Sequence, residues 1–227
     1  MNTDFDFWEA RFRKDGKVWG EDPSPSAAEA VSFFRDFGAR NILVPGCSYG
    51  RHCLLFAKEG FAVTGFDVAL SALYIARDWL FSRSVSAALV RADARWCPFA
   101  PGSFEGAYLF NVLHFFLRED RTRVLNELCR VLVPGAPIVL CVFSDSDPGY
   151  GRGLEVEPGT FDARSGRPAH FFSEASLLEQ LSGFRIARFQ KVEESESHGG
   201  KQHVHVLWTA WVLTPVDPAS PVAVEFL

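Results

Sequence analysis

The chain has 227 residues, of which 48% are apolar and 22% are charged, and its formal net charge is −5. This length and balance predict one globular α/β domain with its own hydrophobic core. The negative net charge argues against a nucleic-acid partner held through phosphate contacts. The five cysteines lie far apart without metal-ligand spacing, so we interpret them as reduced packing residues.

Neither a leader sequence nor a membrane span is apparent in the chain. The first six residues are acidic and lack the apolar core of a signal peptide. The longest uninterrupted apolar run, residues 136–143, is too short to cross a bilayer. We therefore expect a cytoplasmic protein with no membrane partner, acting as a monomer or homodimer.

Residues 1–37 are expected to form a helical segment ahead of the main domain. Phe5, Trp8 and Phe12 recur at helical spacing and predict one amphipathic helix. A turn containing Trp19 follows it. The apolar side chains predict docking of this segment on the domain that follows.

The most informative stretch is residues 41–51, where a buried strand runs into a turn of small residues that opens a helix. Gly46, Ser48 and Gly50 form this turn, and Gly46 permits both a sharp bend and close approach of a ligand to the backbone. Free N–H groups at the start of the helix would face that ligand. The next strand ends at Asp67, whose carboxylate can accept hydrogen bonds from ribose hydroxyls. The pattern predicts a nucleotide-cofactor site.

Strands and helices alternate through the middle of the chain, which predicts a doubly wound parallel sheet. Apolar periodicity places helices at 71–83 and 118–132, and strands at 88–91, 104–110 and 136–143.

The C-terminal part departs from a dinucleotide-binding fold. A short helix is predicted at 173–181, followed by strands at 184–193 and 203–213 joined by a loop at 195–200. Such a hairpin makes the last strand antiparallel. The expected core spans 38–213 and contains an irregular substrate lid at 144–172, and a tail occupies 214–227.

The Gly46-x-Ser48-x-Gly50 spacing resembles the first motif of class I S-adenosylmethionine-dependent methyltransferases. The sequence of residues 44–47 is most similar to that of the thiopurine and thiol methyltransferases, and the Gly50-Arg51 pair resembles the tellurite-resistance branch. The resemblance implies a mostly parallel seven-stranded sheet with a C-terminal antiparallel hairpin, S-adenosylmethionine as cofactor, and a small-molecule acceptor.

In an open parallel sheet, ligands bind beyond the carboxyl ends of the strands, so residues that follow the strands are the candidates. By resemblance, Asp67 would hold the ribose, Asp93 the adenine amino group and Asn111 the cofactor's amino group. Arg11 would pair with the cofactor carboxylate, and Trp19 would stack on the sulfonium. The expected cofactor-binding residues are Arg11, Trp19, Gly46, Cys47, Gly50, Asp67, Val68, Asp93, Ala94 and Asn111.

Three histidines are candidates for a catalytic base: His114, His203 and His205. His114 follows a strand end, and packing with its aromatic neighbours is an equally supported interpretation. His203 and His205 share one face of the last strand. We favour acceptor contacts or an ordinary strand position for them over a metal site, because no cysteine or carboxylate completes a ligand set.

These features together predict S-adenosylmethionine-dependent methyl transfer to a thiol, hydroxyl or related nucleophile of a small molecule. A nicotinamide-dependent oxidoreductase is one alternative, supported by the spacing between Gly46 and Asp67. A non-catalytic cofactor-binding sensor or partner subunit is the other, since Val44 and Ser48 replace the acid and the middle glycine of the family motif.

Overall fold

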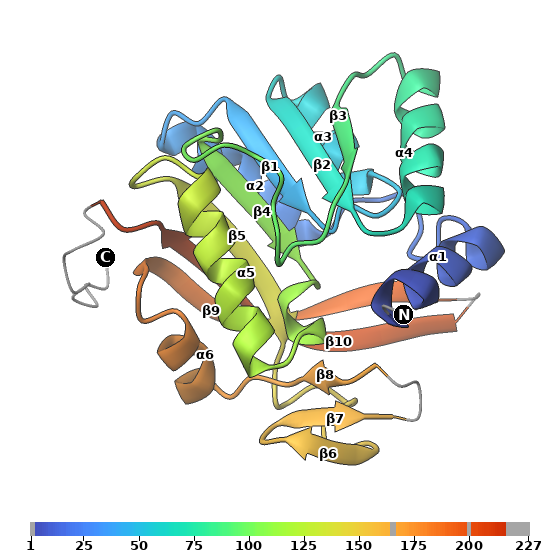
Figure 1. The fold of residues 1–227 in the computed structure, drawn as a ribbon, viewed down its shortest axis with the longest axis vertical. Coiled ribbons are helices and arrows are strands. Elements are labelled where there is room, and N and C mark those ends of the chain that lie inside the picture. Colours follow the sequence, from blue (N-terminus) through green and yellow to red (C-terminus); the bar gives the residue numbers. More distant parts are fainter. Residues whose placement is uncertain (1–2, 164–166, 199–200, 217–227) are drawn as a thin grey trace.

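A seven-stranded sheet organises the chain in a computed structural model that describes residues 3–163, 167–198 and 201–216 (Figure 1). Its strand order is β3-β2-β1-β4-β5-β10-β9, in which β1 to β5 pair in parallel and β10 is antiparallel to both of its neighbours. The strands are β1 Asn41–Pro45, β2 Ala62–Asp67, β3 Ala88–Arg91, β4 Gly106–Phe110, β5 Pro137–Phe143, β9 Arg185–His198 and β10 Lys201–Leu213. The predicted fold class is confirmed.

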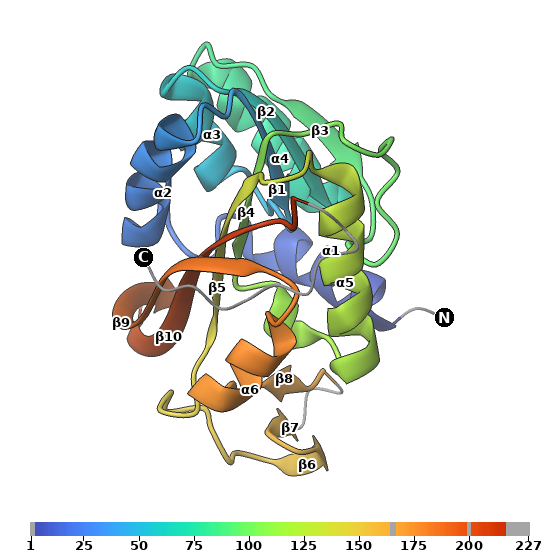
Figure 2. The same cartoon turned by 90° about the vertical axis from the view of Figure 1, so that its left-hand side faces the viewer.

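Helices cover both faces of this sheet, as Figure 2 shows. Leu43 faces the core that contains the apolar side of α5, whereas Ile42 and Val44 face the core beneath α2 and α3, because successive strand side chains alternate between the faces. The helices are α1 Thr3–Asp15, α2 Pro25–Asp36, α3 Arg51–Lys58, α4 Leu70–Ser82, α5 Arg118–Val131 and α6 Glu174–Gln180, with a 3₁₀ turn, η1, at Leu113–Phe115. No helix within the described ranges is both long and apolar enough to span a bilayer.

The C-terminal hairpin is longer than the sequence predicted. The expected loop at 195–200 is wrong for residues 195–198, which continue β9 and pair with the first residues of β10. Residues 195–198 carry no apolar side chain, but backbone pairing in a two-stranded ribbon requires none. The predicted tail is described only as far as residue 216.

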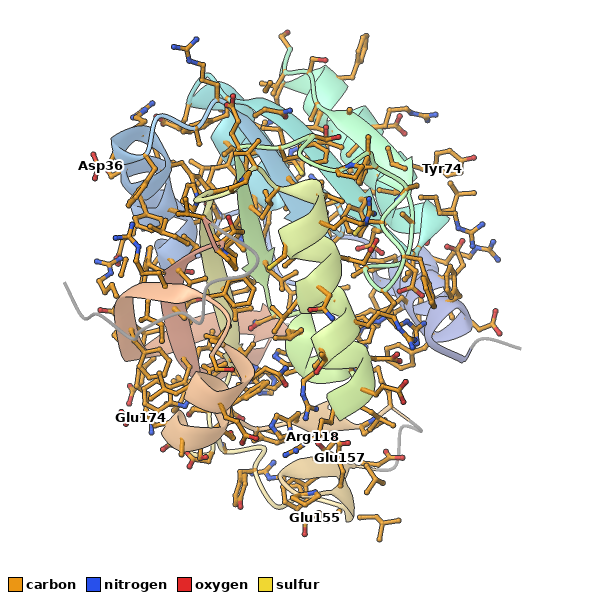
Figure 3. All side chains as sticks on the ribbon, turned by 60° about the vertical axis from the view of Figure 1, so that its left-hand side comes forward. Asp36, Tyr74, Arg118, Glu155, Glu157 and Glu174 are labelled. Carbon is orange, nitrogen blue, oxygen red and sulfur yellow. The ribbon has the colours of Figure 1, made fainter. Side chains whose placement is uncertain are left out.

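Residues 144–172, where a substrate lid was expected, form a long connection that we call the lid, but the predicted irregularity of this segment is wrong. It contains a small antiparallel sheet of β6 Leu154–Glu157, β7 Thr160–Asp162 and β8 Ala169–His170. Glu157 joins this sheet to the main domain by accepting hydrogen bonds from the backbone N–H of Arg118 and from the Arg121 guanidinium. Figure 3 shows Glu157 below the start of α5.

A buried polar cluster attaches the start of α2 to the sheet. The Tyr108 hydroxyl on β4 lies 2.6 Å from Ser24 Oγ and 2.9 Å from Ser26 Oγ. Ser24 Oγ also lies 3.2 Å from Nε2 of His52, at the start of α3. Burial, with a smaller contribution from Arg51, holds the pKa of His52 well below its usual value, so this ring is neutral. The N-terminal segment is therefore fixed to the domain through hydrogen bonds in an apolar setting.

We expect Tyr108→Phe to lower the free energy of unfolding by about 1–2 kcal/mol, because two buried serine hydroxyls lose a partner. Urea denaturation followed by circular dichroism measures this change. Tyr74→Phe is the matched control, since Tyr74 projects from α4 away from the sheet and is 51% exposed (Figure 3). Equal effects of the two substitutions would contradict a stabilising role for the cluster.

Candidate functional site

A cavity of about 480 Å³ lies where β1, β2 and β4 end. One half is lined by the segments that follow the parallel strands, at 46–48, 67–68, 92–95 and 110–112. The other half is lined by the lid, by Phe143 and by His205 of β10, and α1 contributes Phe7, Trp8, Arg11 and Phe12 to the cavity wall. We call these the strand-end half and the lid half.

The glycine turn predicted at 46–50 forms part of the strand-end half. Gly46 has φ +60°, and a Cβ at this position would collide with the Val112 side chain. Ser48 also adopts a positive φ, of +54°. Gly50 has φ +85° and caps the N-terminus of α3, but it does not line the cavity. It therefore shapes the turn and, unlike Gly46, is not in the lining where the predicted cofactor contacts would lie.

Asp67 joins the end of β2 to this turn. Its Oδ2 accepts a hydrogen bond of 2.8 Å from the N–H of Ser48, and its Oδ1 accepts one of 2.9 Å from the N–H of Ala69. Burial raises the pKa of Asp67 to about 6, although these backbone hydrogen bonds act in the opposite direction. Asp67 also lines the cavity together with Val68, and their role in binding a ligand stays a prediction.

Asp93 and Ala94 also line the strand-end half. The Asp93 carboxylate is already bound by Arg95, whose Nη2 lies 2.6 Å from Asp93 Oδ2. Arg95 in turn contacts Asp120 at 2.9 Å. Sequence reasoning missed Arg95, although its position two residues after an acid at a strand end was a local signal.

Two buried oxygen atoms on the cavity wall have no hydrogen-bond partner in the part of the chain that the structure describes. They are Ser48 Oγ and Asn111 Oδ1. Asn111 has φ +55° directly after β4, in the region that asparagine tolerates better than most residues. Buried acceptors of this kind favour a ligand that supplies hydrogen-bond donors.

Aromatic residues of the N-terminal segment lie against the cavity. Trp19 stacks on Tyr49 with ring centres 6.1 Å apart and lies at the same distance from Trp8. Tyr49 donates a hydrogen bond of 2.7 Å to the carbonyl of Gly20, which sequence reasoning did not anticipate. Arg11 lines the cavity and forms an ion pair of 3.1 Å with Asp15.

The structure separates the three histidine candidates. His114 is fully buried and stacks on Phe143 with ring centres 3.8 Å apart, and it does not line the cavity. Its position favours packing with aromatic neighbours over a role as a base on the cavity wall. Burial, with Arg167 as a smaller contributor, holds the pKa of His114 well below its usual value. His203 is exposed and lies outside the cavity lining. His205 lines the lid half.

His205 is paired with an acid that sequence reasoning missed. Its Nδ1 lies 2.9 Å from Oδ2 of Asp147, which follows β5 and whose side chain is 2% exposed. Burial opposes ionisation of Asp147, but hydrogen bonds from His205 and from the N–H groups of Gly149 and Val206 lower its pKa. The partners are 58 positions apart in the sequence, so no local pattern indicated their contact. Within the described ranges, no group of three residues has the composition of a metal site.

The comparisons with known proteins agree with this geometry. A family model described as "Methyltransferase domain" matches residues 43–140. The O-methyltransferase resE of Aspergillus sclerotiorum is 33% identical over 200 residues, which cover 77% of this chain and 70% of that protein. The chain spans between 36% and 50% of three further curated methyltransferases that it matches.

Solved structures share the fold. An S-adenosylmethionine-dependent methyltransferase of Methanosarcina mazei aligns with a TM-score of 0.71 at 24% identity, covering 86% of this chain and all of that one (100%). The Burkholderia thailandensis 1,6-didemethyltoxoflavin-N1-methyltransferase, solved with bound 1,6-didemethyltoxoflavin and S-adenosylhomocysteine, aligns with a TM-score of 0.70 at 19% identity, covering 94% of this chain and 88% of that one.

The raised pKa of Asp67 predicts a distinct pH dependence of stability. The folded chain holds a proton on Asp67 up to about pH 6, whereas the unfolded chain loses it near 3.8. The folded state therefore binds more protons between these values, and its stability falls as the pH rises through this window. Relative to Asp67→Asn, we expect the wild-type free energy of unfolding to fall by about 2 kcal/mol between pH 4 and pH 7.

Denaturant titrations of both proteins across this range measure the difference. Asp78→Asn, at an exposed position on α4, is the control and should show no such trend. A difference that grows in favour of the wild type as the pH rises would mean that the fold stabilises the ionised carboxylate.

Proposed function

Because the chain belongs to the S-adenosylmethionine-dependent methyltransferases, we propose that it methylates a hydroxyl group of a small molecule. S-adenosylmethionine is its cofactor. The observation that carries the choice of a hydroxyl is the buried Asp147 carboxylate bound to His205 on the cavity wall. The resE relative is named as an O-methyltransferase, which supports the same choice.

The strand-end half of the cavity fits the cofactor. Gly46 lines this half, and Asp67 offers a carboxylate to the ribose hydroxyls. Ser48 Oγ and Asn111 Oδ1 are buried acceptors available to the amino groups of the ligand. Asp93 and the Ala94 backbone would receive the adenine, and Cys47 and Val68 would contribute packing surface.

When bound, S-adenosylmethionine supplies an activated methyl group and releases a neutral thioether, so the protein chiefly has to position the acceptor and exclude water. Trp8, Trp19 and Phe12 cover the cavity from the N-terminal side and limit access of water. In this proposal, Trp19 lies near the sulfonium and Arg11 near the cofactor carboxylate.

His205 is the proposed base, and Asp147 is its positioning residue. The ionised Asp147 carboxylate can only accept hydrogen bonds, so Nδ1 of a neutral His205 must be the donor. Nε2 then carries the lone pair and can take the proton of an acceptor hydroxyl as the oxygen attacks the methyl carbon. A thiol acceptor would need less help, because a larger fraction of it is ionised at neutral pH.

The alternatives make different predictions. The match to methyltransferases removes the support for a nicotinamide-dependent oxidoreductase, which rested on glycine spacing alone. A cofactor-binding sensor would bind S-adenosylmethionine but turn over no acceptor. The cytoplasmic location and the monomeric or homodimeric state stay predictions.

Calorimetric titration with S-adenosylmethionine, S-adenosylhomocysteine and NADH tests the cofactor site. We expect the first two to bind with about micromolar Kd and NADH not to bind. Asp67→Asn should weaken both by at least about tenfold, because a charged acceptor is lost. Asp78→Asn is the control. Binding of NADH alone, or no binding at all, would contradict the proposed site.

With a hydroxyl acceptor found by screening, we expect His205→Gln to lower kcat about 100-fold or more at neutral pH. The deficit should shrink as the pH approaches the pKa of the acceptor hydroxyl, because the acceptor then ionises without a base. His203→Gln, on the same strand but outside the cavity lining, is the matched control. An unchanged kcat in His205→Gln would exclude its role as base.

A further inference from the structure

The lid half of the cavity has aromatic walls. Phe143 stacks on Phe171 with ring centres 5.5 Å apart and planes inclined by 15°. Phe161 lies 6.1 Å from Phe171, and Phe115 lies 6.3 Å from Phe143. All four rings line the cavity. A planar aromatic molecule gains contact area and favourable ring geometry against such walls.

The lid itself contributes two arginines to this half, Arg152 and Arg167. The guanidinium carbon of Arg167 lies 4.1 Å from the ring centre of Phe7, 4.3 Å from that of Trp8 and 4.4 Å from that of Phe115. These rings replace part of the water around the guanidinium and lower the local dielectric constant. The attraction between the guanidinium and an anion is therefore screened less than at an open surface. Arg152 is exposed at the lid.

The acidic residues of the cavity wall lie in the other half from Arg152 and Arg167. Asp67 and Asp93, which belong to the strand-end half, are the aspartates among the described lining residues. Asp93 is bound by Arg95. Asp147 contacts the lid half through His205, with which it forms an ion pair or charge-assisted hydrogen bond. Among the described lining residues, positive charge therefore predominates in the lid half.

His205 connects the aromatic walls to the proposed chemistry. Its ring centre is 5.0 Å from that of Phe143. An aromatic acceptor whose ring packs against Phe143 would place a ring substituent next to the His205 imidazole. A hydroxyl substituent at that position could transfer its proton to the imidazole.

We propose that the acceptor is a planar aromatic hydroxyl compound that also carries an anionic group, such as a carboxylate. Its ring packs against Phe143 and Phe171, its hydroxyl lies at His205, and its anionic group pairs with Arg152 and Arg167. This inference rests on the proposed methylation of a hydroxyl and adds the class of compound. Arg167 also links the lid with α1 and η1, and a purely structural link of this kind would not discriminate between charged and neutral ligands.

Binding of 3-hydroxy-2-naphthoate and 2-naphthol to the protein saturated with S-adenosylhomocysteine tests the proposal, since the two probes differ by one carboxylate. We expect the naphthoate to bind at least about tenfold more tightly, the gain typical of a charge-assisted hydrogen bond. Arg152→Gln and Arg167→Gln should each reduce this preference without changing the Kd of S-adenosylhomocysteine. Arg123→Gln, on the outer side of α5, removes the same charge and should preserve the preference.

Three other results would each overturn one of the hypotheses. Equal affinity for the two probes, or binding of neither up to about 1 mM, overturns the acceptor class if S-adenosylhomocysteine binds normally. Equal loss of both probes in Arg167→Gln, together with an unchanged preference in Arg152→Gln, would show a structural link and overturn the anion site. Failure to bind S-adenosylhomocysteine would instead overturn the proposed function.

Discussion

The strand-end half of the cavity depends on the Asp67 carboxylate, whose two oxygens accept hydrogen bonds from two different turns. One oxygen holds the N–H of Ser48 in the glycine turn, and the other holds the N–H of Ala69 ahead of α4. The side chain that would accept hydrogen bonds from a ribose therefore also fixes the two turns beside it. The folded chain keeps this acid buried despite the cost of desolvation, and its pKa is raised for that reason.

The cavity divides electrostatically along the same line as it divides structurally. Among the described lining residues, the two aspartates, Asp67 and Asp93, follow the parallel strands, where Arg95 pairs with Asp93, whereas the lid contributes Arg152 and Arg167. A cationic cofactor and an anionic acceptor would each meet a complementary wall, and this arrangement discourages the acceptor from binding at the cofactor's end. The His205 and Asp147 pair belongs to the lid half.

Most of the fold could be predicted from the sequence because its signals are local. The helices near 70–82 and 118–131 follow from 3.6-residue periodicity, and the parallel strands follow from short apolar runs between turns. The lid sheet and the end of β9 could not be predicted, because their strands are too short or too charged to give a clear alternation of apolar and polar residues, although their pairing partners lie close in the sequence.

By itself, the sequence determined the strand, glycine turn, helix and acid of the strand-end half, since each depends on backbone conformation and on neighbours within one βαβ unit. Only the tertiary structure decided which histidine reaches the cavity. The register of β10 on β5, with Leu207 opposite Phe143, brings His205 to the wall beside Asp147, while packing buries His114 behind Phe143. Strand register and the pairing of residues 58 positions apart are long-range properties, and no local pattern of residues encodes them.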